Sequence, residues 1–245
     1  MASSRLAVIH TARTPLTDEA GKPRTFSPHP PQLRACDLCP GRCCRKYIQT
    51  SIPDAVLLCA TLGVPFSAIL RLAPASPGPR AFAVDKDERY IAAEDGWPGY
   101  GELALRQHPD QSCVFLAEFE GHFRCGVYGL RPSVCRLYPL SWTDGERQGG
   151  PNSVLCPFPY AVTPSMEARF LDDLEQARLG WARHEALVAE WHARPAEDPR
   201  SFDAFLRFVV PRAAAELGVD AGPMLDPRSA ADKYAAAVSA GRQTR

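Results

Sequence analysis

The chain contains 245 residues, of which 45% are hydrophobic, and its 28 basic side chains are balanced by 28 acidic ones. A chain of this length and composition can bury an ordinary hydrophobic core, so its size alone does not make a metal necessary for folding. Because the net charge is zero, we expect neither nucleic acid nor an acidic membrane surface as a partner.

Residues 1–34 predict an extended or disordered arm rather than a packed element. The segment has no sustained hydrophobic periodicity and carries five prolines, namely Pro15, Pro23, Pro28, Pro30 and Pro31. The apolar run at residues 6–9 is too short for the core of a signal peptide, and no later stretch is apolar enough to span a membrane. We therefore expect a cytoplasmic protein that makes no membrane contact.

Four cysteines then follow within nine residues in the pattern C-x2-C-x3-C-C: Cys36, Cys39, Cys43 and Cys44. Several convergent thiolates bind a soft metal, and the binding energy counts directly as folding energy. In a reducing cytoplasm such a cluster indicates metal binding rather than a disulfide scaffold. Disulfides, a redox relay and unconnected buried thiols are the alternatives.

Residues 53–62 predict a short helix that ends at Gly63, and a second helical segment is expected over residues 65–72. Cys59 lies inside the first helix among apolar neighbours. Cysteine in that setting is typically a buried core thiol, so we leave Cys59 out of the ligand set.

The next part of the chain predicts short strands. Residues 81–84 and 89–92 flank an acidic turn, and residues 113–125 carry apolar β-formers on both sides of a glycine-containing turn. The second pattern is typical of a hairpin. It would place Cys113 and Cys125 at facing strand ends.

Pro132 suits the first turn of a short helix, which would present Cys135 one turn along. Cys156 is expected on a loop after a Gly-Gly-Pro turn. With the hairpin cysteines, these two residues complete a second set of four. Both sets lie in locally basic segments, and guanidinium groups offset the negative charge of a thiolate site. A solvated basic face and a phosphate-binding patch are the alternatives.

The cysteine-free region 163–245 predicts helices. Residues 166–192 form a long amphipathic pattern, residues 202–217 a second one interrupted by Pro211, and residues 230–240 a last one. We therefore expect an α+β fold that is mainly helical. It would consist of the arm, a cysteine-cluster domain over residues 35–162 with short hairpins and helices, and a helical C-terminal region.

Four motifs together carry a family resemblance: C-D-L-C-P-G-R-C-C at 36–44, C-V-F-L at 113–116, R-C-G-V-Y at 124–128 and R-P-S-V-C-R-L-Y-P at 131–139. In combination they are far more specific than any one of them. They resemble the YkgJ-type cysteine-cluster family, which is described as a zinc- or iron-chelating domain. The resemblance covers roughly residues 34–160.

The resemblance implies a set of metal ligands, with the last member by weaker analogy: Cys36, Cys39, Cys43, Cys44, Cys113, Cys125, Cys135 and Cys156. It also implies that Arg131, Arg136 and Tyr138 support the site. The family is similar to the cysteine-bearing part of flagellin lysine N-methylases, where such a cluster accompanies an iron–sulfur centre. This chain is shorter than those enzymes, so their activity is not assigned to it directly. The main hypothesis is a metal-binding module with a protein partner or substrate. The alternative is a protein-modifying enzyme with the cluster near its active site.

Eight thiolates allow two four-cysteine sites, one [4Fe–4S] cluster with spectator thiols, or a binuclear centre. Both zinc and iron–sulfur clusters accept four thiolates. Consecutive side chains diverge in most backbone conformations, so Cys43 and Cys44 can share one small tetrahedral site only in a tight turn. The C-x2-C-x3-C spacing also resembles iron–sulfur loops at least as closely as zinc ribbons, whose ligands usually come in C-x2-C pairs. These arguments favour a [4Fe–4S] cluster over Zn²⁺.

Overall fold

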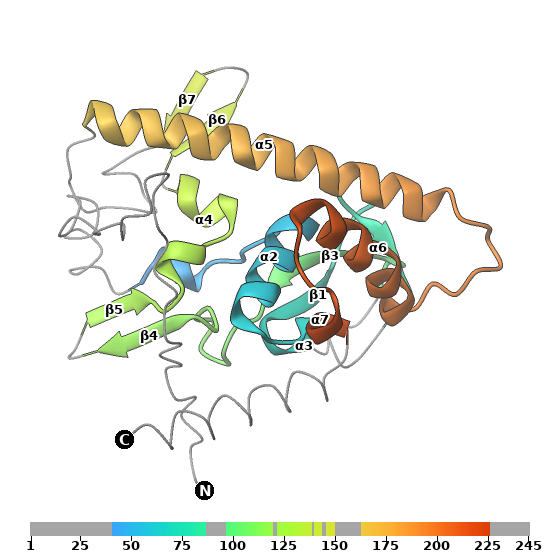
Figure 1. Cartoon of the computed structure of the whole chain (residues 1–245). Coiled ribbons are helices and arrows are strands. Elements are labelled where there is room, and N and C mark those ends of the chain that lie inside the picture. Colours follow the sequence, from blue (N-terminus) through green and yellow to red (C-terminus); the bar gives the residue numbers. More distant parts are fainter. Residues whose placement is uncertain are drawn as a thin grey trace, which may run out of the picture.

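The computed structural model describes residues 41–86, 97–119, 122–138, 140–143, 146–149 and 163–225 (Figure 1). This part of the chain combines helices with three small antiparallel sheets, an architecture compatible with the predicted α+β class. None of its helices is long and apolar enough to cross a membrane. The predicted arm over 1–34 and the predicted elements over 89–92 and 230–240 lie outside the described residues.

Helix α2 (Ile52–Leu62) forms where its end signals predict it. The Ser51 side chain accepts a hydrogen bond from the backbone N–H of Asp54 at 3.2 Å, and Gly63 ends the helix in the left-handed conformation. The buried face of α2 includes Cys59, whose exposed fraction is 0%. The predictions of the helix and of a core thiol at Cys59 are both confirmed.

The helix predicted over residues 65–72 is only partly correct. Helix α3 (Phe66–Ile69) is short, and the chain continues as strand β1 (Leu70–Pro74), which pairs antiparallel with strand β3 (Tyr100–Leu105). The long-range partner supplies the backbone hydrogen bonds of β1, so tertiary pairing overrides the local helical pattern. Strand β2 (Phe82–Ala83), inside the predicted strand 81–84, pairs with the other edge of β3.

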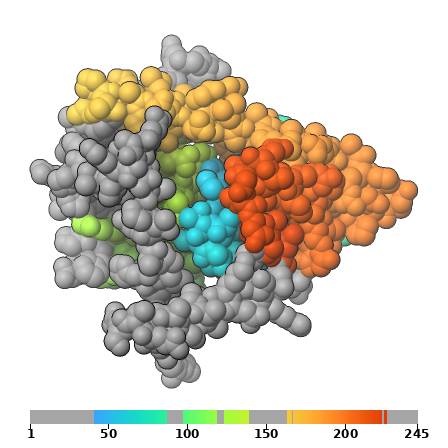
Figure 2. All heavy atoms as spheres, viewed as in Figure 1, coloured from blue at the N-terminus to red at the C-terminus, as the bar shows by residue number. Residues whose placement is uncertain are grey.

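Within residues 163–225, three helices pack on α2 and the three-stranded sheet. Helix α5 (Pro164–His192) extends along the molecule from the cysteine-bearing segments to helix α6 (Phe202–Leu217), and α7 (Gly222–Leu225) follows (Figure 1). The helices predicted over 166–192 and 202–217 are thereby confirmed, with Pro211 inside α6. In Figure 2, α2 is at the surface, with α6 beside it.

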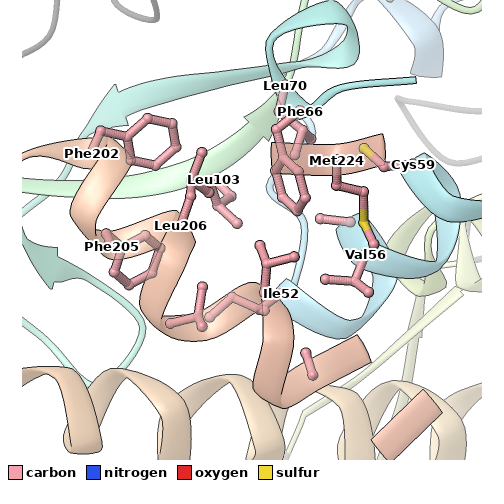
Figure 3. Close-up of a cluster of buried hydrophobic side chains, with 14 of the residues drawn as sticks. Ile52, Val56, Cys59, Phe66, Leu70, Leu103, Phe202, Phe205, Leu206 and Met224 are labelled. Atoms are coloured by element: carbon pink, nitrogen blue, oxygen red, sulfur yellow. The ribbon is translucent and has the colours of Figure 1, made fainter. Parts of the chain in front are cut away.

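The hydrophobic core lies between α2, the three-stranded sheet and the C-terminal helices. Phe82 of β2 stacks on Phe205 of α6, with ring centroids 3.7 Å apart. Figure 3 labels ten core side chains: Ile52, Val56, Cys59, Phe66, Leu70, Leu103, Phe202, Phe205, Leu206 and Met224. Core side chains thus come from both sides of residue 162, and the division of the chain there stays a prediction.

Buried polar contacts fix α5 against the sheet and α2. His184 is 1% exposed, and its Nδ1 accepts a hydrogen bond from the backbone N–H of Ile52 at 3.2 Å. Since Nδ1 is the acceptor, Nε2 carries the proton and donates it to the backbone carbonyl of Arg80 at 2.9 Å. The indole N–H of Trp191 donates to the carbonyl of Ala83 at 2.7 Å. His184 is therefore a satisfied core histidine.

Candidate metal centre

A tight turn brings two adjacent cysteines together. Cys43 and Cys44 begin the 3-10 helix η1 (Cys43–Arg45), and their Sγ atoms are 3.9 Å apart. Two thiolates on one tetrahedral zinc ion, each at about 2.3 Å, lie about 3.8 Å from each other. The pair therefore fits a single ion, and the divergence expected of consecutive side chains does not occur in this turn.

Backbone pairing brings Cys113 next to Cys44. The backbone N–H of Cys113 donates to the carbonyl of Cys44 at 2.6 Å. Strands β4 (Leu116–Phe119) and β5 (His122–Cys125) then form the predicted hairpin, which is confirmed. Cys125 pairs with Leu116, whereas Cys113 precedes β4 by three residues, so the two cysteines do not face each other in register.

Cys135 joins these thiols from helix α4 (Ser133–Leu137), which begins after Pro132 as predicted. The partly buried sulfur of Cys135 is influenced electrostatically by Cys125, Cys113 and Cys43, so these side chains share one region. Within the described ranges, however, no three Cys, His, Asp or Glu side chains are close enough to hold one ion. The thiols gather as one close pair with three further sulfurs around it.

Three predicted ligands, Cys36, Cys39 and Cys156, lie outside the described residues and stay predictions. The chain between Cys135 and Cys156 contains a hairpin that was not predicted, formed by β6 (Leu140–Thr143) and β7 (Glu146–Gly149). Strand β7 (Glu-Arg-Gln-Gly) is weakly β-forming in sequence, and the four residues of β6 are too few to give a clear periodicity.

Burial keeps most of these thiols protonated in the absence of a metal. It raises the pKa of Cys113 to about 11, and it raises the pKa values of Cys125 and Cys135 as well. The pKa of Cys44 is raised by its side-chain hydrogen bond with Cys43 and by its partial burial. Metal binding would therefore have to displace protons from several sulfurs.

Hydrogen bonds and a nearby positive charge counteract the effect of burial on the pKa values and favour the thiolate form. The backbone N–H of Phe115 donates to the sulfur of Cys113, and that of Val127 donates to the sulfur of Cys125. The hydrogen bond from Cys44, with the charge of Arg131, lowers the pKa of Cys43 to about 7. Amide donors and a nearby cation are what stabilise sulfur ligands in metal centres.

The arginines implied as supporting residues hold the segment that carries Cys135. The guanidinium group of Arg131 lies 3.9 Å from the ring centroid of Tyr128, and its Nε donates to the Tyr128 carbonyl at 3.2 Å. Arg136 pairs with Asp173 of α5 at 2.8 Å. A supporting role for Arg131, Arg136 and Tyr138 stays a prediction. Asp173 was not identified from the sequence, since nothing in its helical pattern marks a partner on α4.

Gly41 sets the path of the chain into the cysteine pair. Its φ is +72°, and a Cβ added there would lie 2.9 Å from Cδ1 of Leu116 on β4. We expect Gly41→Ala to lower the free energy of unfolding by about 1–3 kcal/mol, because strained backbone and overpacking each cost energy. Urea unfolding of both proteins measures the difference.

Gly129→Ala is the matched control for this substitution. Gly129 lies in the 3-10 helix η2 (Tyr128–Leu130), with open space where a Cβ would be and no positive φ. It should change stability much less than Gly41→Ala. Equal stability of the two variants would show that the turn does not require glycine at position 41.

Comparison with known proteins gives one match. Residues 35–157, just over half of the 245-residue chain, match the CxxCxxCC family, described as "Putative zinc- or iron-chelating domain". No curated protein and no solved structure matches the chain. The matched range contains all eight predicted ligands and the described cysteines that lie near one another. On this match, the chain belongs to the CxxCxxCC family of zinc- or iron-chelating domains.

Proposed function

We propose that this protein holds a metal centre through thiolates, within a cysteine-rich module formed by residues 35–162 and covered by the helical region 163–245. The observation that carries the proposal is the 3.9 Å separation of the Cys43 and Cys44 sulfurs, with three more thiols in the same region. The family supports zinc or iron as the metal. The proposed ligands are Cys36, Cys39, Cys43, Cys44, Cys113, Cys125, Cys135 and Cys156.

The close pair changes the balance between the two candidate metals. One ground for preferring a [4Fe–4S] cluster was the divergence of consecutive side chains, and that divergence is absent at Cys43 and Cys44. The other ground, the C-x2-C-x3-C spacing, is unchanged and supports iron–sulfur as the alternative. The four cysteines of a [4Fe–4S] cluster each bind a different iron, whereas a tetrahedral zinc ion takes several thiolates itself. We therefore propose that Cys43 and Cys44 bind one Zn²⁺ together, with an iron–sulfur cluster as the alternative.

A zinc ion with a complete shell of thiolates supplies folding energy and offers no open position for a substrate. The chain's own contribution is to orient and stabilise the sulfurs. The amides of Phe115 and Val127 donate to two of them, and the charge of Arg131 favours the thiolate of Cys43. A mainly structural role follows from these properties, with the exposed faces of the helical region available to a protein partner.

Metal analysis of protein purified without oxygen tests this proposal. Iron, zinc and acid-labile sulfide are measured per chain together with the visible absorption spectrum. Colourless protein with stoichiometric zinc and no sulfide is the expected result. Brown protein with stoichiometric iron and sulfide would support the iron–sulfur alternative. Metal-free, folded protein whose eight proposed ligand cysteines react with a thiol reagent would overturn the proposal.

The methylase-like activity, the location and the excluded partners remain hypotheses. A methylase-like activity on a protein substrate is not favoured by any contact among the described residues, and we do not propose it. The cytoplasmic location and the expectation of no membrane and no nucleic-acid partner likewise rest on the sequence alone.

A further inference from the structure

Helix α4, which carries Cys135, is too short to be stable by itself. It covers only Ser133–Leu137, and Pro132 at its N-terminal cap provides no side-chain hydrogen bond. Isolated helices of this length are strongly disfavoured in water, because nucleation fixes several residues for few hydrogen bonds. The orientation of the Cys135 side chain must therefore be fixed by contacts from other elements.

The first such contact comes from α2. Oδ2 of Asp54 accepts a hydrogen bond from the backbone N–H of Ser133 at 3.0 Å and another from the Ser133 hydroxyl at 2.6 Å. Ser133 is 3% exposed, so these bonds are shielded from water. A carboxylate at the first turn also interacts favourably with the helix dipole. Asp54 thus supplies from another helix the cap that Pro132 lacks.

The second contact comes from α5. Oδ1 of Asp173 accepts from Nε of Arg136 at 2.8 Å, and both side chains are about three-quarters buried or more. Arg136 also donates from its NH1 to the carbonyl of Arg131 at 2.6 Å, which ties the helix to the segment before it. Ion pairs shielded in this way are stronger than exposed ones.

Cys135 lies between the two anchored residues, two positions after Ser133 and one before Arg136. We propose that Asp54 and Asp173 are positioning residues that hold the Cys135 sulfur ready for the metal. This inference rests on the proposed metal-binding function. Neither carboxylate is assigned to the metal; each acts through its partner on α4. If α4 is not held in advance, metal binding must also order Cys135, and this cost weakens the affinity for the metal.

The test measures affinity for Zn²⁺ by competition with a chromophoric chelator, well below the unfolding temperature of each variant. We expect Asp54→Ala and Asp173→Asn each to weaken zinc binding by about 10-fold or more, in line with losses of outer-shell partners in other metal sites. Asp173→Glu, which keeps the charge, should recover part of the affinity. Glu185→Gln is the control, since it removes a carboxylate of the same helix from an ion pair with Arg80.

Cys135→Ser in the same assay tests the ligand role of Cys135 separately from the positioning role of Asp54 and Asp173. If Cys135→Ser binds zinc as the wild type does, the proposed ligand itself is wrong. If Cys135→Ser loses affinity while Asp54→Ala and Asp173→Asn keep it, only the positioning role is overturned. Should the larger changes prevent folding, Ser133→Ala removes one of the two bonds to Asp54 and should still lower the affinity; unchanged affinity there would also count against positioning.

Discussion

Replacement of Cys135 by serine is expected to remove most of the bound metal and to lower solubility. The sulfur is partly buried near other thiols, and a hydroxyl group is a poor ligand for a soft metal. Structural zinc contributes an apparent binding free energy of about 10–16 kcal/mol in small domains, so loss of one ligand affects folding as well as metal content. Metal per chain and the thermal unfolding temperature measure both effects. Cys39→Ser should behave in the same way.

Cys59→Ala is the control for the cysteine replacements. The Cys59 side chain is fully buried in the hydrophobic core, and burial alone raises the pKa of its thiol. Its removal should lower stability through the small cavity that it leaves, but metal content should stay at the wild-type level. Loss of metal in Cys59→Ala equal to that in Cys135→Ser would contradict the ligand assignment.

Acidification is expected to destabilise the protein through His184. Burial lowers the pKa of this imidazole to about 4. The hydrogen bond with the Arg80 carbonyl opposes this shift, the charge of Arg80 adds to it, and Glu185 opposes it slightly. The unfolded chain titrates near the ordinary value of about 6.5 and thus binds more protons between the two values. The stabilisation is present above pH 6.5 and is lost as the pH falls toward 4. It amounts to about 3 kcal/mol in total, of which about 2 kcal/mol is lost by pH 5.

His184→Gln isolates this effect from other acid-sensitive groups, including the thiols. Urea unfolding at pH 7 and pH 5 gives the free energy of unfolding of the wild type and the variant. The variant should be less stable at pH 7, because the backbone groups of Ile52 and Arg80 lose their buried partner. Its stability should fall less between pH 7 and pH 5. An identical fall in both proteins would show that His184 does not control the acid response.

Local sequence signals predicted the elements whose ends they mark. Gly63 marks the end of α2, apolar β-formers on both sides of a glycine-containing segment predicted β4 and β5, and apolar periodicity predicted α5 and α6. Strand β3 had no comparable signal, because its ladder depends on partners distant in sequence. The same dependence made the end of the expected helix over 65–72 wrong.

In the candidate site, too, the local sequence predicted which residues to consider but not the contacts between residues distant in sequence. Spacing and family resemblance identified the cysteines but could not give the backbone angles that bring the Cys43 and Cys44 sulfurs to 3.9 Å. The contacts of Asp54 and Asp173 with α4 join residues 79 and 37 positions apart. Side chains on two regular helices carry no local mark of such partners.

X-ray absorption spectroscopy at the edge of the bound metal tests the central claim most directly, because it reports the atoms in the first coordination shell. Thiolate ligation of zinc predicts a shell of sulfur atoms at about 2.3 Å. In Cys59→Ala this sulfur shell should be unchanged. A first shell of oxygen or nitrogen alone, with the cysteines still open to alkylation, would contradict the proposal that these thiolates hold the metal.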